Sequence, residues 1–299
     1  MAYPYDFISS SDEIISSGAK LSAGGKRKMV AVAAAQDVDV LGALSSAEAE
    51  GILDATLFGD KTLIEKMAAD GNIDISRMTI VAEQDVNKAA YAAVRMAAEG
   101  KADVIMKGFV STSTLLKTVL SKDFNLRTKN TLSHVAVLDI PGYGKLLSMS
   151  DGGMVVKPDL EQKLQIMENA ILISRALKLN HIRVAVSGVN DNDTKAFLGR
   201  ARELHMPDLE LKGPLTFDRA AGRGGDTDIL ISASIEECNI IAKALINFAG
   251  AVFAGVIVGA KVPVSLVSRT DTIKNKKASV SLACLIADYY QKSGYGVVQ

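Results

Sequence analysis

The sequence contains no tryptophan, only two cysteines and no excess of charge of either sign. Aromatic residues make up 5% of the 299 residues and hydrophobic residues 48%. This profile favours α/β layers packed with Ala, Val, Ile and Leu over an aromatic-rich all-β module. Lys+Arg and Asp+Glu both number 34, so no basic surplus points to nucleic acid. A small charged ligand therefore needs a local site.

The cysteines and the N-terminal segment exclude further classes of protein. Cys238 and Cys284 are too few for a disulfide framework and lie in apolar surroundings, so we expect buried, inert thiols. Residues 1–15 lack the basic and apolar regions of a signal peptide. No apolar run reaches the roughly 18 residues of a membrane span. We therefore expect a cytoplasmic protein that contacts neither membrane nor nucleic acid.

Several motifs of common enzyme classes are also missing. The chain has no H-E-x-x-H, G-x-S-x-G, G-x-G-x-x-G or Walker A string, which argues against zinc peptidases, serine hydrolases, dinucleotide-binding folds and P-loop proteins. His134, His181 and His205 are scattered, so we expect no metal site. His134 lies in an apolar strand, where a hydrogen-bonded core histidine is the more ordinary interpretation than a catalytic one.

Short apolar runs alternate with helical patterns along most of the chain. We expect residues 1–28 to be a solvated entry segment and residues 29–120 to form strands and helices in alternation, which predicts a parallel sheet covered on both faces. Two strands joined by a Pro/Gly turn, residues 132–139 and 146–149, predict a hairpin that breaks this alternation. Pro158-Asp159 predicts the start of a long helix, and residues 221–228 a flexible loop.

One stretch of the first half has the pattern of an anion-binding turn. A buried strand over residues 104–106 is followed by a glycine, a run of hydroxyl residues and a helix that we expect to start near Thr114. Such a turn directs unpaired N–H groups and a positive helix end at one point. An ordinary βα turn with a Ser/Thr cap is the competing interpretation. The candidate binding residues are Lys107, Gly108, Ser111, Thr112, Ser113 and Lys117.

Two further turns contain candidate residues. Ser268-Arg269-x-Asp271 follows an apolar run and precedes a helix, where α/β proteins place ligand groups. Arginine suits bidentate phosphate recognition, and the aspartate could orient it or accept a proton. Asp151, between Ser150 and two glycines, is a turn aspartate unless its turn faces a cleft. A surface ion pair remains the competing interpretation of Arg269 and Asp271.

Three long segments resemble a known family. Residues 102–120 (ADVIMKGFVSTSTLLKTVL), 126–171 (LRTKNTLSHVAVLDIPGYGKLLSMSDGGMVVKPDLEQKLQIMENAI) and 253–271 (FAGVIVGAKVPVSLVSRTD) are similar to the phosphate acetyl/butyryltransferase family, above all to its butyryl-type members. The resemblance implies two α/β domains of isocitrate/isopropylmalate dehydrogenase-like architecture with the active site between them. We assign residues 1–128 and 262–299 to domain I and residues 129–261 to an inserted domain II.

The resemblance also implies an activity and roles for residues. The family moves an acyl group between coenzyme A and inorganic phosphate without a metal, a cofactor or a covalent enzyme intermediate. Its members imply a homo-oligomer that is functionally coupled to an acyl kinase. By position, Lys107 to Ser113 match the acyl-phosphate loop. The implied catalytic residues are Ser268, Arg269, Asp271 and Lys117, and the implied substrate-binding residues of the second segment are Ser133, His134 and Asp151.

This chain departs from the acetyl-type pattern at several positions. Lys117 replaces an arginine, Asn275 replaces the aspartate proposed as base for the thiol, and Lys212 begins the segment usually read D-G-P-L. A phosphate acetyltransferase, a weakly active relative that binds coenzyme A or acyl phosphate, and a decarboxylating dehydrogenase are the alternatives. The last is disfavoured because acidic metal ligands are missing.

Overall fold

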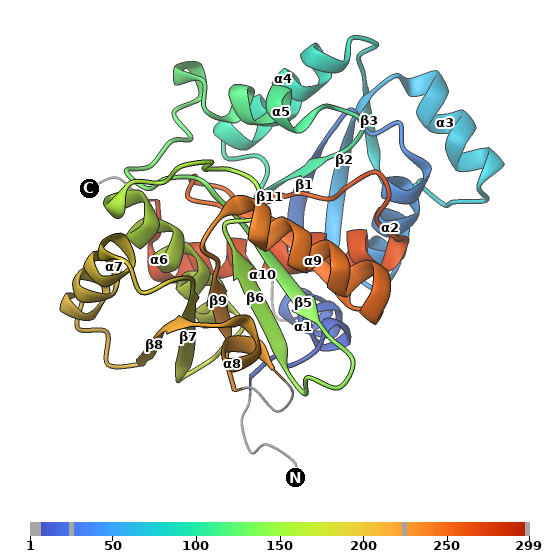
Figure 1. Cartoon of the computed structure of the whole chain (residues 1–299). Coiled ribbons are helices and arrows are strands. Elements are labelled where there is room, and N and C mark those ends of the chain that lie inside the picture. The colour runs from blue at the N-terminus through green and yellow to red at the C-terminus, as the bar shows by residue number, and fades with distance from the viewer. Residues whose placement is uncertain (1–6, 24–26, 223–225, 297–299) are drawn as a thin grey trace. The chain divides into compact units, whose positions relative to one another are not determined.

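The computed structural model describes residues 7–23, 27–222 and 226–296. The chain divides into two compact units (Figure 1). Unit 1 contains the described part of residues 1–13 together with residues 130–253, and unit 2 contains the described part of residues 14–129 and 254–299. Both units combine strands with flanking helices, which confirms the α/β class.

Unit 2 is built on parallel strands that alternate with helices, as the sequence predicts. The strand order is β3–β2–β1–β4–β11 with each neighbouring pair parallel, and β10 adds antiparallel to β11. The elements that follow helix α1 (Ser11–Ala23) are β1 Lys28–Ala33, α2 Val38–Ala49, β2 Leu53–Gly59, α3 Lys61–Asp70, β3 Thr79–Ala82, α4 Val86–Ala98, β4 Val104–Lys107, α5 Thr112–Val119, η1 Lys122–Phe124, β10 Val252–Val258, β11 Val264–Ser265 and α10 Ile273–Ser293.

Two layers of helices bury the strands of unit 2. Alternate residues of a strand point to opposite faces, and Val30 and Val32 of β1 pack with α2 and α10 in one core cluster. The other face of β1 is covered by α4. The buried side of α4 consists mostly of alanines, which let the helix backbone approach the sheet closely.

Unit 1 contains a second set of strands in the order β5–β6–β9–β7–β8. β5 and β6 form the predicted antiparallel hairpin, whereas the other neighbouring pairs are parallel. The predicted loop over residues 221–228 lies partly outside the described residues. The elements are β5 Ser133–Asp139, β6 Leu146–Ser150, α6 Leu160–Ala176, β7 Ile182–Ser187, α7 Asn192–Glu203, β8 Leu209–Leu215, α8 Phe217–Ala221, β9 Ile229–Ile231 and α9 Ile235–Ala249.

The helix after Pro158 begins as its sequence predicts. Asp159 accepts the backbone N–H of Gln162 at 2.8 Å, and the Gln162 side chain accepts the N–H of Asp159 at 3.0 Å. This reciprocal pair is a capping box, which satisfies two of the N–H groups that a helix start leaves unpaired.

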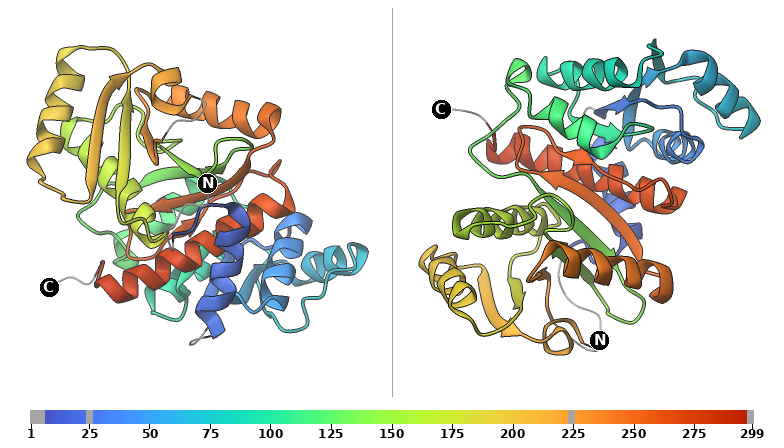
Figure 2. Two further views of the ribbon diagram at one scale, coloured as in Figure 1. Left: turned by 90° about the horizontal axis from the view of Figure 1, so that it is seen from below. Right: turned by 45° about the horizontal axis from the view of Figure 1, so that its top comes forward.

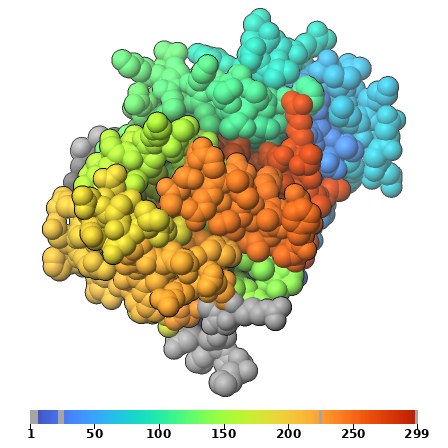
Figure 3. Space-filling view, viewed as in Figure 1, coloured from blue at the N-terminus to red at the C-terminus, as the bar shows by residue number. Residues whose placement is uncertain are grey.

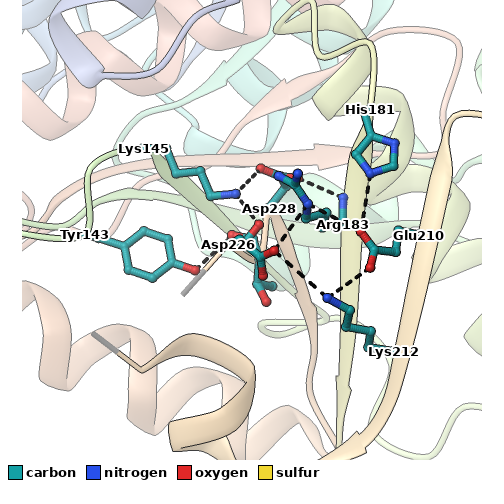
Figure 4. Close-up of polar contacts among 9 residues, drawn as sticks. Tyr143, Lys145, His181, Arg183, Glu210, Lys212, Asp226 and Asp228 are labelled. Carbon is teal, nitrogen blue, oxygen red and sulfur yellow. Dashed lines mark hydrogen bonds and ion pairs between the residues drawn. The ribbon is translucent and has the colours of Figure 1, made fainter. Parts of the chain in front are cut away.

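The buried carboxylate of Asp228 anchors the residues that directly precede β9 (Figure 4). Asp228 is 5% exposed and accepts the Lys145 ammonium at 2.6 Å and the backbone N–H of Arg183 at 2.7 Å. Beside it, the Tyr143 hydroxyl donates to the carbonyl of Thr227 at 2.9 Å. These contacts lie at the amino end of β9, opposite to the strand ends where α/β proteins bind ligands. We therefore interpret this network as structural.

The expectation of a solvated entry segment is wrong for the residues that the structure describes. Residues 1–6 and 24–26 lie outside the described ranges, but Ser11–Ala23 forms helix α1. Ile14 is fully buried, and a Cβ added to Gly18 would lie 2.9 Å from a methyl carbon of Ile52. Figure 2 shows α1 beside α10. The segment is helical because its few apolar residues gain a packing surface that only the folded chain provides.

Candidate functional site

Three neighbouring strands of unit 2 end at the same edge of its sheet. β1, β4 and β11 are parallel, with Ala33 beside Lys107 and Met106 beside Ser265. Ligands of open α/β sheets bind outside the carboxyl ends of such strands. Eight of the candidate residues lie in the loop after β4, in the turn after β11 or directly beside them. This edge is therefore the first candidate for a site in unit 2.

The loop after β4 begins with a buried cation. Lys107 is 7% exposed, and its ammonium donates to the carbonyl of Gly108 at 3.2 Å. The N–H of Gly108 donates to Ala33 O at 3.0 Å, and a Cβ at Gly108 would collide with the carbonyl oxygen of Ala34. Glycine is therefore required by the close approach of two backbones, as the sequence pattern suggests.

Helix α5 starts two residues earlier than the sequence predicts. Ser111 is its N-cap and accepts the N–H of Thr114 at 3.1 Å, while Ser111 and Ser113 lie within 3.1 Å of each other through their hydroxyls. Thr112 is the first helical residue. The start of α5 thus gathers three hydroxyl side chains at the positive end of a helix dipole, an arrangement that favours an anion.

Lys117 lies elsewhere on the same helix. Its side chain is exposed in the last turn of α5. The described part of the chain provides it with no hydrogen bond or ion pair. The structure therefore does not place Lys117 in contact with the other candidate residues of unit 2, and its catalytic role stays a prediction.

The turn after β11 is closed by its own aspartate. Asp271 is 5% exposed, and its Oδ2 accepts the N–H of Ser268 at 2.6 Å. The N–H of Asp271 donates in turn to Ser268 O at 3.2 Å. The Ser268 hydroxyl lies 3.2 Å from the Thr270 hydroxyl. Asp271 thus orients Ser268, and its role as a base stays a prediction.

An aromatic contact joins this turn to the loop after β4. The guanidinium carbon of Arg269 lies 4.5 Å from the ring centroid of Phe109. Burial and then the positive charge of Arg269 lower the pKa of Lys107, while Asp37 acts in the opposite direction. Two cations that are distant in sequence therefore face one region, which costs Coulomb energy unless an anion is bound there.

The candidate residues of unit 1 are held in a separate cluster. The Asp151 carboxylate accepts four backbone N–H groups, those of His134 at 2.9 Å, Gly153 at 3.3 Å, Met154 at 3.1 Å and Val155 at 2.7 Å. Burial raises the pKa of Asp151, and these four donors oppose the rise. This carboxylate shapes the turn after β6.

Ser133 and His134 are both buried at the start of β5. The Ser133 hydroxyl accepts the side-chain amide of Asn169 at 2.8 Å. Burial lowers the pKa of His134 to about 4, and Lys243 adds to the effect. Neither ring nitrogen of His134 has a hydrogen-bond partner among the described residues. The expectation of a core histidine is confirmed, whereas the expected hydrogen bond is not found.

A pocket of about 150 Å³ lies in unit 1 outside the carboxyl ends of β6, β9 and β7. Connections to α7 and α9 leave the neighbouring strands β7 and β9 at this point. Apart from Asp151, sequence reasoning did not select its lining, because these residues belong to short turns without a motif. The polar lining includes Lys163, Ser187, Asp191, Thr194, Ser232 and Ser234.

Sequence reasoning also missed two residues beside the turn of unit 2. Phe109 is 44% exposed, and an exposed aromatic in a loop between glycine and hydroxyl residues was an available signal. Lys276 is buried in α10. It shares a three-to-four spacing with the buried Val280, Ala283 and Cys284, which places it on the inner face of the helix.

Two expectations concern metals and thiols. The residues that the structure describes contain no group of three or more His, Cys, Asp or Glu side chains that could hold a metal ion. Cys238 and Cys284 are free and buried, and burial raises the pKa of each thiol to about 12. The expectation that both thiols are buried is confirmed. In the described ranges, no helix is long and apolar enough to cross a membrane.

Comparison with known proteins yields one family. The family model described as phosphate acetyl/butaryl transferase matches residues 78–284. A phosphate butyryltransferase of Clostridium acetobutylicum is 35% identical over 281 residues, which cover 87% of this chain and 93% of the relative. A branched-chain phosphotransacylase of Enterococcus faecalis V583 is 27% identical with a TM-score of 0.74, over 87% of this chain and 99% of that structure.

A more distant structure shares the fold alone. The 4-hydroxythreonine-4-phosphate dehydrogenase of Klebsiella pneumoniae is 13% identical with a TM-score of 0.59, over 87% of this chain and 99% of that structure. This likeness agrees with the dehydrogenase-like architecture expected from the sequence.

Proposed function

The chain belongs to the phosphate acetyl/butaryl transferase family and is a phosphate acyltransferase, and we propose that it exchanges a butyryl group between coenzyme A and inorganic phosphate. The names of the relatives at 34–35% identity and of the branched-chain phosphotransacylase support an acyl chain of four or five carbons. Acetyl transfer is the alternative, because phosphate acetyltransferases match at 30–32% identity.

One observation supports unit 2 as the phosphate site. Lys107, the start of α5 and Arg269 lie at the carboxyl ends of neighbouring parallel strands, and Arg269 reaches the loop after β4 through Phe109. Two cations and a helix N-terminus suit a phosphate dianion. Such a site aligns one phosphate oxygen with the acyl carbon and thereby supplies much of the rate.

The proposed reaction needs few chemical steps. A phosphate oxygen attacks the thioester carbonyl, a carbon–oxygen bond forms, the carbon–sulfur bond breaks, and the thiolate of coenzyme A leaves and takes up a proton. We assign the phosphate to Lys107, Gly108, Arg269 and the hydroxyl residues Ser111, Thr112 and Ser113. We assign to Ser268 a hydrogen bond from its hydroxyl to the charge that develops on the acyl oxygen. Lys117, Asp271, Ser133, His134 and Asp151 remain proposed site residues with the geometry described above.

No cofactor enters this proposal, since coenzyme A is a substrate and fixed cations can neutralise the phosphate.

We also propose a homo-oligomer and a functional coupling to an acyl kinase. The oligomer is supported by exposed apolar side chains on α9, a surface helix of unit 1 (Figure 3). Ile240 and Phe248 are 70% and 89% exposed. The measurement is the molar mass in solution, compared between wild type and Phe248→Asp.

The test of function is the release of free coenzyme A from butyryl-CoA with and without added phosphate. We expect release that depends on phosphate and yields one butyryl phosphate for each thiol. Binding of coenzyme A without turnover would instead favour the weakly active relative. That second candidate rests on Asn275, which is 4% exposed and whose backbone N–H donates to the helix cap Thr272 at 3.2 Å.

A further inference from the structure

The largest fully buried side chain of the described residues is a lysine. Lys276 lies in the first turns of α10 and its side chain is 1% exposed. A buried ammonium loses its hydration, so it is tolerated only when protein acceptors replace the water. The identity of those acceptors therefore indicates what the residue does.

The acceptors of Lys276 belong mostly to the Ser268–Asp271 turn. Its Nζ donates to the carbonyl of Asp271 at 2.7 Å and lies 3.4 Å from the carbonyl of Arg269. A carboxylate oxygen of Asp39 on α2 lies 3.5 Å away. An ammonium has three donors, and two of the three acceptors here are backbone oxygens of the turn that presents Arg269.

Three contacts hold the Ser268–Asp271 turn. The Arg269 guanidinium lies over Phe109, its carbonyl faces Lys276, and Asp271 holds Ser268 through the backbone N–H. The side chain of Arg269 is exposed, so its position depends on the backbone beneath it. Without Lys276, the two carbonyls would lose a charged donor in a buried place.

Lys276 also adds charge to the same region. Its positive charge and that of Arg269 both help lower the pKa of Lys107, although burial is the larger cause, and Asp37 and Asp271 oppose them. Since Lys276 is buried, it contributes charge without contacting a ligand. A bound phosphate dianion would experience this field through the turn.

We propose that Lys276 is a positioning residue that fixes the Ser268–Asp271 turn and thereby sets the affinity for phosphate. The inference rests on the proposed phosphate site of unit 2. It predicts an effect on phosphate that is separate from any effect on acyl-CoA, because Lys276 acts on the residues assigned to phosphate.

The neighbouring lysine provides a matched control. Lys277 lies in the same turn of α10, and its Nζ donates to the Ser46 hydroxyl at 2.9 Å and to Glu50 at 2.5 Å. Both lysines thus link α10 to α2 or to residues beside it, yet the contacts of Lys277 do not involve the turn. Lys277→Met removes a comparable link without disturbing Arg269.

The kinetic test compares Lys276→Met, Lys276→Arg and Lys277→Met. For Lys276→Met we expect the KM for phosphate to rise about tenfold or more, the scale of a lost charge-assisted hydrogen bond. The KM for butyryl-CoA should change less than about twofold. Lys276→Arg should restore part of the phosphate affinity, and Lys277→Met should resemble wild type. Equal changes in both KM values, or the same phosphate defect in Lys277→Met, would overturn the proposal.

A second measurement does not depend on turnover. Amide hydrogen exchange over residues 266–272 should accelerate in Lys276→Met and stay at the wild-type rate in Lys277→Met. If wild type shows no phosphate-dependent turnover, the proposed function fails while this arm still tests the positioning role. If Lys276→Met does not fold, Lys276→Gln, which keeps a donor but removes the charge, replaces it in both measurements. Wild-type exchange over residues 266–272 together with a wild-type KM for phosphate in Lys276→Gln would refute the inference.

Discussion

Replacing Arg269 by alanine should remove most of the phosphate-dependent turnover and leave the protein folded. The side chain is exposed, and its aromatic contact is with Phe109 at 4.5 Å. A cation–π contact at an exposed site contributes about 0.5–1 kcal/mol. We therefore expect the free energy of unfolding to fall by no more than about 1 kcal/mol.

The effect on catalysis should be much larger than the effect on stability. Loss of one charge-assisted contact made in the transition state costs on the order of 3 kcal/mol, which is roughly a hundredfold in kcat/KM. Lys107 cannot compensate, because it is 7% exposed at the end of β4 and its ammonium already donates to the carbonyl of Gly108. The kcat/KM of Arg269→Lys should lie between those of wild type and Arg269→Ala. An ammonium keeps the charge, but it loses the planar guanidinium and its contact with the Phe109 ring.

The assay follows release of coenzyme A from butyryl-CoA at several phosphate concentrations, with thermal unfolding measured in parallel. Arg95→Ala is the control, because Arg95 is an exposed arginine in α4 of the same unit and pairs with Glu99, the C-cap of that helix. We expect the turnover of Arg95→Ala to lie within about twofold of wild type, because an exposed ion pair contributes little. Unchanged turnover in Arg269→Ala would remove this residue from the site.

Three further predictions concern the acyl chain, a buried histidine and a buried ion pair. Butyryl-CoA should exceed acetyl-CoA in kcat/KM by up to about fifteenfold, because each of its two extra methylenes contributes about 0.8 kcal/mol when buried. The measurement is kcat/KM for a series from acetyl- to isobutyryl-CoA at fixed phosphate. The highest kcat/KM for acetyl-CoA would refute the butyryl assignment. The pKa of His134 is near 4 when folded and near 6.5 when unfolded, so the unfolded state binds more protons between these values and stability falls by about 3 kcal/mol as pH drops from 6.5 to 4. Denaturant unfolding of His134→Gln should lose that slope, and an identical slope would contradict the burial argument. Asp228→Asn should lower the free energy of unfolding by about 3 kcal/mol, because it leaves the Lys145 ammonium, 2.6 Å away, without its charged partner. Asp226→Asn, at an exposed position, should lower it by less than about 1 kcal/mol. Equal losses in the two variants would show that burial is not the cause.

The elements whose signals are local were predictable from the sequence. The hairpin of β5 and β6 follows from two apolar runs joined by a Pro/Gly turn, and α6 follows from the capping residues at Asp159 and Gln162. The loop after β4 was found because glycine and hydroxyl residues follow a buried strand. In each case, neighbouring residues determine the backbone through sterics and short-range hydrogen bonds.

Helix α1 and Lys276 were not predictable in the same way. α1 has a polar composition, and its burial depends on Ile52, which lies far along the chain. Lys276 resembles a solvated lysine in the sequence. Its burial depends on packing against α2, whose Asp39 lies 3.5 Å from the ammonium although it is far away in the sequence. Asp151 is similar, since a turn aspartate was expected but one of its four N–H donors comes from the other strand of the hairpin.

The sequence by itself determined the α/β class, the alternation of strands and helices in unit 2, and the family through three long motifs. Only the tertiary structure decided which candidate side chains meet. It joined Arg269 to Phe109, put Lys117 in the last turn of α5, and surrounded the Asp151 carboxylate with N–H groups. The physical reason is that secondary structure is selected by near neighbours, whereas contacts within a site depend on strand order and register, which bring together residues separated by more than a hundred positions.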